Sequence, residues 1–266
     1  MRKMGFTLAE VLITMTIIGV VAALTTPVLL HNVATADIGP KLAKFRATVE
    51  NANKMILVEN DVNRLSVLIR RNANNARTAA YTGLLQNFMR LDSGADPITH
   101  IKDYAGNNES NVQAQVSLFT NDRNEDNAAG GNTLKANQII ISLRDSDNPF
   151  TFRTVEGMAA HFFIAPSVGE AGAPQTEPES LGVILVDING SAIPNSLGKD
   201  IFGFILGNDG MLTPIGSRAV GSGNDDAFAN DSSSWTTSCT ADAVTSQGLT
   251  CTGSIFANDL KVVYQD

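Results

Sequence analysis

An uncharged stretch near the N-terminus constrains this chain more than any other feature of its sequence. Residues 11–30 form a run of 20 residues without a formal charge, and His31 follows it. With a helical rise of about 1.5 Å per residue, this run would be roughly 30 Å long, which matches the hydrocarbon core of a bilayer. The sequence therefore predicts one membrane-spanning helix at about residues 11–30.

The charges on either side of this helix predict its orientation. The α-amine, Arg2 and Lys3 precede the apolar run, and basic groups flanking a span favour the cytoplasmic side. We therefore expect a single-pass protein of the cytoplasmic membrane with its C-terminus outside.

The composition of the whole chain limits its partners. The 266 residues carry a net charge of −8, and apolar residues make up 43% of them against 17% charged. This balance favours a folded protein with a sizeable core. An acidic protein has no general electrostatic attraction to nucleic acid, so no nucleic-acid partner is predicted, although a local basic patch remains open.

Two details distinguish the start of the apolar run from an ordinary targeting signal. Glu10 places a carboxylate at the beginning of the span, where a charge costs less than the roughly 2.5–3.5 kcal/mol it costs at mid-helix. The short basic segment also ends in Gly5-Phe6, before the apolar run rather than after it. Both details call for a specific explanation.

The motif Gly5-Phe6-Thr7-Leu8-x-Glu10, followed by an apolar helix, resembles the class III signal of type IV prepilins and type II secretion pseudopilins. The resemblance implies that prepilin peptidase cuts between Gly5 and Phe6 and methylates the new N-terminus at Phe6. It also implies an assembly role for Glu10 and a helix kink at Pro27. The motif and its helix end at residue 30, so the rest of the chain is not covered.

The resemblance gives a physical reason for Glu10. Cleavage would leave a cationic amine on Phe6, and in a polymer of packed helices this amine can neutralise Glu10 of a neighbouring subunit. A buried charge is tolerated only when it is paired, so the pairing would set the register between subunits. The implied partners are copies of this chain, other pilins, the peptidase, the inner membrane, and a pilus or type II secretion assembly platform with its ATPase.

Alternative interpretations of the N-terminus remain open. Residues 21–23 form a small-x-small site that a signal peptidase could cut, and the helix could be a plain signal anchor. A membrane-anchored binding or enzymatic ectodomain is the main rival to a filament subunit. We find no phosphate-binding glycine loop and no Gly-x-Ser-x-Gly motif, and no enzyme is predicted. Scattered carboxylates leave a carboxylate-pair enzyme open.

The pattern after the membrane helix predicts an α+β head. A second helix is indicated by an apolar stripe at three- and four-residue steps, and Gly39-Pro40 should kink or break the helix before it. Residues 60–92 are again helix-like. Residues 92–136 are typical of a loop with short elements, and residues 170–180 and 216–238 are typical of loops. The stripe consists of Leu42, Phe45, Val49, Ala52 and Ile56.

Strand patterns dominate the second half of the chain. They predict an antiparallel sheet that packs on the long helix, as in a pilin-like fold. The Asn208-Asp209-Gly210 sequence predicts a hairpin turn. The expected strands cover residues 138–143, 149–155, 158–164, 181–188, 201–206 and 211–215. The chain is thus divided into a leader (1–5), an N-terminal helix (6–58) and an extracytoplasmic head with a C-terminal disulfide loop (59–266).

Three oxygen-bearing side chains form a candidate calcium site. Asp187, Asn189 and Asp200 offer the hard ligands that Ca²⁺ prefers. The segment is not an EF-hand, because Gly198 stands at the twelfth position from Asp187, where a bidentate glutamate would be needed. Turns stabilised by Asp and Asn side chains are the alternative explanation. No other cofactor is predicted.

The two cysteines, Cys239 and Cys251, lie close together in sequence. In an exported domain such a pair predicts a disulfide, which would stabilise the fold by roughly 3 kcal/mol on the chain-entropy model. Two free buried thiols are the alternative. A metal site is disfavoured because no histidine lies near them in sequence.

Overall fold

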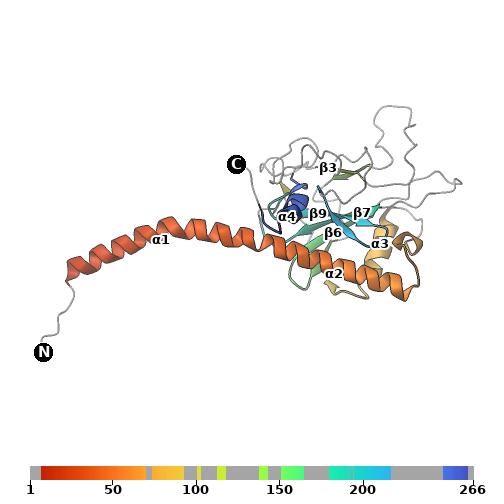
Figure 1. Ribbon diagram of the computed structural model, residues 1–266, viewed down its shortest axis with the longest axis horizontal. Helices are drawn as coiled ribbons and strands as arrows, with labels where there is room; N and C mark the ends of the chain where they lie inside the picture. The colour runs from red at the N-terminus through yellow and green to blue at the C-terminus, as the bar shows by residue number, and fades with distance from the viewer. Residues whose placement is uncertain are drawn as a thin grey trace, which may run out of the picture.

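The computed structural model shows a long helix leading into an α+β head (Figure 1). It describes residues 7–69, 74–92, 101–102, 113–117, 138–142, 151–164, 180–190, 192–193, 195–216 and 248–262. The helices are α1 (Leu8–Ala36), α2 (Ile38–Glu59), the 3-10 turn η1 (Leu65–Val67), α3 (Asn74–Leu85) and α4 (Cys251–Ala257). The strands are β1 (Leu91–Asp92), β2 (Ile101–Lys102), β3 (Gln113–Ser117), β4 (Gln138–Ser142), β5 (Thr151–Thr154), β6 (Ala159–Ile164), β7 (Ser180–Asp187), β8 (Asn195–Ser196), β9 (Ile201–Gly207) and β10 (Leu212–Pro214).

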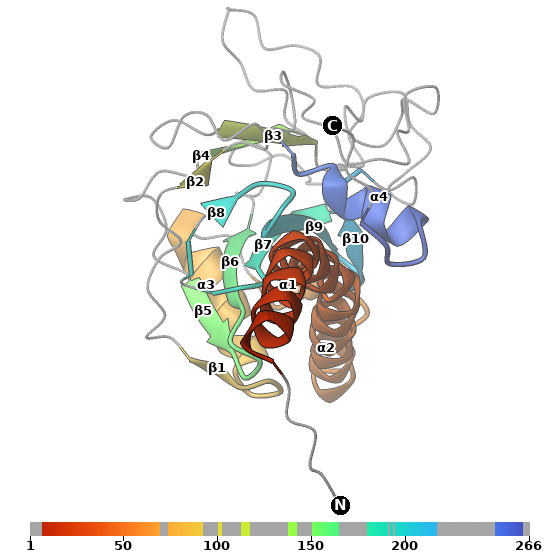
Figure 2. The ribbon, with the colours of Figure 1, turned by 90° about the vertical axis from the view of Figure 1, so that its left-hand side faces the viewer.

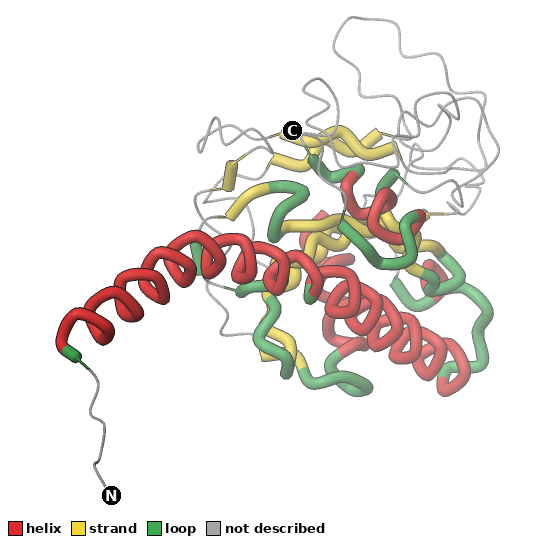
Figure 3. Tube along the Cα trace, turned by 60° about the vertical axis from the view of Figure 1, so that its left-hand side comes forward, coloured by secondary structure: helices red, strands yellow, loops and turns green. Residues whose placement is uncertain are grey.

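Helices α1 and α2 follow one another almost without interruption. The break between them falls at Asp37, and Pro40 lies in the first turn of α2. A proline is tolerated there because its missing N–H would have bonded to a residue before the helix. α1 runs through Pro27, and it arches gently away from the head rather than bending sharply (Figures 1 and 3).

The centre of the head is a six-stranded antiparallel sheet in the order β1-β5-β6-β7-β9-β10. Every residue of β7 is buried, because β6 and β9 flank it and other elements cover both faces. Figure 2 shows α2 lying along one side of this sheet, with the short strands β3 and β4 on the other. The predicted α+β class is confirmed.

The apolar stripe predicted on the second helix forms the main contact between helix and sheet. All five of its side chains are buried. The ring of Phe45 lies 6.0 Å from that of Phe204 on β9, and the ring of Phe204 lies 5.9 Å from that of Phe256 in α4. The long helix is therefore part of the head's core from Ile38 onward.

Residues 60–92 depart from the helix that the sequence predicts. The helix ends at Glu59, and Asp61 adopts a φ of 50° in the left-handed region. The chain then bonds to the sheet, because the N–H of Leu65 donates to the carbonyl of Asn208 at 2.8 Å. Among the described residues of this stretch, η1 and α3 are the helical segments. Residues 92–136, predicted as a loop with short elements, contain the short strands β2 and β3 in their described part. The predicted loops at 170–180 and 216–238 lie almost wholly outside the described residues.

Candidate functional site

The first described residues form a complete capping box at the start of α1. The N–H of Glu10 donates to the Thr7 hydroxyl at 3.3 Å, and the N–H and hydroxyl of Thr7 both donate to Glu10 Oε2 at 2.8 Å. This reciprocal arrangement satisfies donors that a helix N-terminus otherwise leaves unpaired. Both bonds to the carboxylate end on Oε2. Within the described part of the chain, Oε1 of Glu10 accepts no hydrogen bond.

Over residues 8–26, the surface of α1 is apolar on all sides and uncovered. Leu8 is 79% exposed and Leu24 is 71% exposed, and the described side chains between them are exposed as well. A helix that is apolar all round needs an apolar environment on every face. The head does not provide that environment, so either lipid or other helices must do so.

The threonine hydroxyls of α1 are compatible with such an environment. Thr14, Thr16, Thr25 and Thr26 each donate to a backbone carbonyl three or four residues earlier, at 2.7–3.0 Å. These bonds leave no hydroxyl donor to desolvate in hydrocarbon. By length and composition, residues Leu8–Thr26 are sufficient to cross a membrane, and this is the one such helix among the described residues.

The family comparison decides the nature of this N-terminus. Residues 1–26 match the family model described as the prokaryotic N-terminal methylation motif. The chain carries the class III signal of type IV pilins and pseudopilins. Neither a curated protein nor a solved structure matches the chain. The motif therefore identifies the N-terminal segment of this pilin-like chain and does not assign its head.

The processing residues lie at the edge of what the structure describes. Gly5 and Phe6 fall outside the described residues, so the predicted cleavage between them and the methylation of Phe6 stay predictions. Thr7 and Glu10 lie inside, next to the expected new N-terminus. The role of Thr7 as the helix cap was missed at the sequence level, although the Thr-x-x-Glu spacing of a capping box was there to find.

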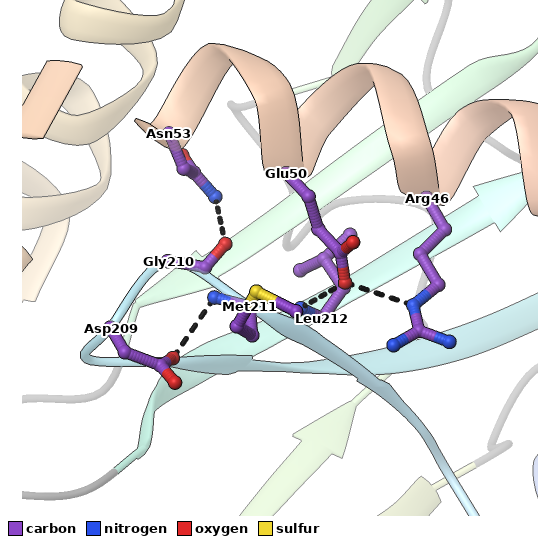
Figure 4. A network of polar contacts seen from close by, with 7 residues as sticks. All are labelled: Arg46, Glu50, Asn53, Asp209, Gly210, Met211 and Leu212. Atoms are coloured by element: carbon purple, nitrogen blue, oxygen red, sulfur yellow. Dashed lines mark hydrogen bonds and ion pairs between the residues drawn. The ribbon is translucent and has the colours of Figure 1, made fainter. Parts of the chain in front are cut away.

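A polar network joins α2 to the β9–β10 hairpin (Figure 4). Asn53 Nδ2 donates to the carbonyl of Gly210 at 2.8 Å, and Glu50 Oε1 accepts from the N–H of Leu212 at 3.0 Å and from Arg46 Nε at 2.9 Å. Tyr81 of α3 donates its hydroxyl to Asn53 Oδ1 at 2.9 Å. The role of Asn53 was not predicted from the sequence. Its position within an apolar stripe was the only available signal.

This network matters because it fixes the helix against the head. The hairpin turn at Asn208-Asp209-Gly210 was predicted, and Gly210 has the positive φ, 83°, that such a turn requires. Buried polar groups with all partners in place lock an orientation more tightly than apolar packing does. The network therefore fixes the orientation of α2 relative to the β9–β10 hairpin.

The candidate calcium ligands come together in the head. Asp187 ends β7, Asp200 precedes β9, and the N–H of Ile188 donates to the Asp200 carbonyl at 3.0 Å. The backbone N–H of Asn189 donates to Asp187 Oδ1 at 3.0 Å, and its Nδ2 donates to Asp200 Oδ2 at 3.3 Å. The arrangement thus contains the Asx turn that the sequence offered as the alternative, and it places the two carboxylates beside each other.

Burial makes this carboxylate pair electrostatically unfavourable. It is the main reason that the pKa of Asp187 is raised to about 8, and the negative charge of Asp200 contributes to the rise. Burial also raises the pKa of Asp200 to about 6. The ion pairs among the described residues, Lys44–Glu156 and Arg46–Glu50, do not include either carboxylate.

Cys251 is buried at the start of α4. It packs against the turn before Asp200, since a Cβ added to Gly198 would lie 2.6 Å from Cys251 Sγ. Cys239 lies outside the described residues, so the disulfide stays a prediction.

Proposed function

We propose that this chain is a structural subunit of a type IV pilus or of the related type II secretion pseudopilus. The observation that supports it best is the capped Glu10 at the start of an uncovered apolar helix, within the methylation motif. Proteins with this motif are usually structural and non-enzymatic. The described part of the head offers no group of three or more His, Cys, Asp or Glu side chains that suggests metal catalysis.

The subunit would be processed before it assembles. Prepilin peptidase removes the leader (1–5) and methylates Phe6, which leaves the helix (6–58) in the cytoplasmic membrane and the head (59–266) outside. The subunit then moves into a bundle of N-terminal helices, where neighbouring copies or other pilins cover the exposed face of α1. The platform and ATPase of the assembly machinery would supply the work of extraction.

The capping box supports a division of labour on Glu10. Oε2 caps the subunit's own helix through Thr7, whereas Oε1 remains available to the Phe6 amine of a neighbour. One carboxylate can therefore hold the first turn of its helix and pair with a second subunit. Removing one partner from a buried ion pair typically costs about 3–5 kcal/mol.

Three variants separate these two roles of Glu10. Glu10→Gln keeps an oxygen for the cap and removes the charge, Thr7→Val removes the cap hydroxyl and keeps the charge, and Glu10→Ala removes both. We expect Glu10→Gln and Glu10→Ala to reduce the sheared filament fraction to background, and Thr7→Val to assemble within a few-fold of wild type. The fraction is measured by immunoblot after shearing.

The controls concern processing and membrane insertion. Mass spectrometry of the N-terminal peptide should show methylated Phe6 in wild type, and membrane fractionation should show all variants inserted. A mature chain that begins at Met1, or a start after residue 23, would contradict the proposal. An ectodomain that uses α1 only as an anchor predicts no filament fraction and no effect of Glu10→Gln. Loss of assembly in Thr7→Val with intact processing would assign Glu10 to capping alone.

A further inference from the structure

Two buried carboxylates meet at one end of the central sheet. Strands β7 and β9 are antiparallel neighbours with Asp187 opposite Ile201, so the end of β7 and the residue before β9 are brought to the same place. Asp187 is fully buried, and Asp200 is 7% exposed. The sheet register thus holds two acidic side chains together in a part of the head that water barely reaches.

One oxygen of this pair is unsatisfied. Asp187 Oδ1 accepts from the N–H of Asn189, and both oxygens of Asp200 accept hydrogen bonds, from the N–H of Ser196 and from Asn189 Nδ2. Asp187 Oδ2 is buried and accepts no hydrogen bond in the part of the chain that the structure describes. A buried carboxylate oxygen without a donor carries a large desolvation penalty. It calls for a cation or a proton.

The chemistry of the surrounding atoms selects among cations. The side-chain donors are two carboxylates and the amide of Asn189, which offers its oxygen after a half-turn. These are hard oxygen ligands, and two carboxylates match the charge of a divalent ion. Zn²⁺ prefers nitrogen and sulfur ligands, and Mg²⁺ requires near-ideal octahedral geometry, whereas Ca²⁺ accepts irregular sets of six to eight oxygens completed by carbonyls and water.

We propose that Asp187, Asn189 and Asp200 bind a calcium ion that ties the end of β7 to the start of β9. The ion takes Asp187 Oδ2 as its buried ligand and removes the repulsion between the two carboxylates. With two charged ligands, the site belongs with the weaker calcium sites of extracellular modules, whose Kd values are about 10⁻⁴–10⁻³ M. The proposal concerns the head and does not depend on filament assembly.

The test measures the thermal stability of the full chain in detergent after removal of metal with a chelator. Adding CaCl₂ to about ten times the Kd should raise the Tm of wild type by roughly 3–6 °C, and the Tm should continue to rise with the logarithm of the free calcium concentration. MgCl₂ at the same concentration should give a smaller shift. Equilibrium dialysis with calcium should show one ion bound per chain.

Matched variants locate the effect. Asp187→Asn and Asp200→Asn should abolish the calcium-dependent shift. Asp209→Asn should retain it, because Asp209 lies in the β9–β10 turn, where its Oδ1 accepts from the N–H of Met211 at 2.9 Å. If an Asp187 or Asp200 variant does not fold, the wild-type dialysis and the Asn189→Ala variant, which should weaken binding several-fold, still decide the matter.

Three results would overturn the proposal. The first is a wild-type Tm that does not respond to calcium, or responds equally to magnesium. The second is a calcium shift that survives in Asp187→Asn. The third is a chelated protein that is stabilised by mild acid and not by calcium, since this would show that a proton, rather than a metal ion, satisfies Asp187.

Discussion

Helices α1 and α2 are consecutive in the chain but are built for different surroundings. Among the described side chains of α1, none is buried, and large apolar residues are exposed on every face. α2 has eight buried residues on one side and polar residues on the other. The change falls at Asp37. The comparison shows that two hydrophobic patterns follow one another along one nearly continuous helix. The pattern of α1 suits an apolar environment on every face, and that of α2 suits packing against a water-soluble core.

The largest predicted effect is on the stability of the head, which should depend on the core side chains of α2 and not on those of α1. Phe45→Ala in α2 should lower the free energy of unfolding of the head by about 3–5 kcal/mol, because its ring packs against Phe204 in the core. Ile17→Ala in α1 should leave it unchanged, since Ile17 is 57% exposed. Denaturant unfolding of the full chain in detergent, followed by near-UV circular dichroism, measures both. An equal loss in the two variants would show that α1 belongs to the folded unit of the head.

Two glycines extend the comparison from large side chains to close backbone contacts. Gly39 at the start of α2 is buried against the C-terminal segment, where an added Cβ would collide with the carbonyl of Leu260. Gly39→Ala should therefore destabilise the head by about 1–3 kcal/mol. Gly19 of α1 has no atom within 4 Å of an added Cβ, so Gly19→Ala should not affect the head. The same unfolding assay applies, and an unchanged Gly39→Ala variant would argue against this contact.

The sequence predicted the features that are local in the chain. The apolar run of α1 and the stripe of α2 were readable because helical periodicity directly encodes which faces are buried. The strands and the Asn208-Asp209-Gly210 turn were readable for the same reason. The helical prediction for residues 60–92 was only partly right. The N–H of Leu65 donates to the carbonyl of Asn208, and this long-range hydrogen bond overrides the local helix propensity.

The rest depends on pairings that no local pattern contains. In the sequence, Asn53 is a polar residue within an apolar stripe. In the structure its amide donates to the carbonyl of Gly210, which is 157 residues away in the chain. The oxygens of Asp187 and Asp200 were suggested as ligands by residue type, but their burial follows from the register of β7 and β9. Glu10 was identified from the motif, and its bonds to Thr7 required only local geometry. The residues of the candidate sites could therefore be predicted from the sequence. In the head, the way in which those residues come together in space could not.

The smallest predicted effect is a pH dependence of the unfolding free energy, which arises because a histidine is buried in the head. His161 of β6 is buried, with its Nδ1 3.0 Å from Thr151 Oγ1 on β5, and burial lowers the pKa of His161 to about 3. The unfolded histidine titrates near 6.5, so unfolding takes up a proton between these two values. The stabilisation is complete above pH 6.5 and falls as the pH drops toward 3, by about 1 kcal/mol per pH unit. His161→Gln should remove this component of the slope while retaining a polar partner for Thr151. Unfolding free energies at pH 6.5 and 5.5 test the difference, and parallel slopes in the two proteins would mean that the folded head admits the proton.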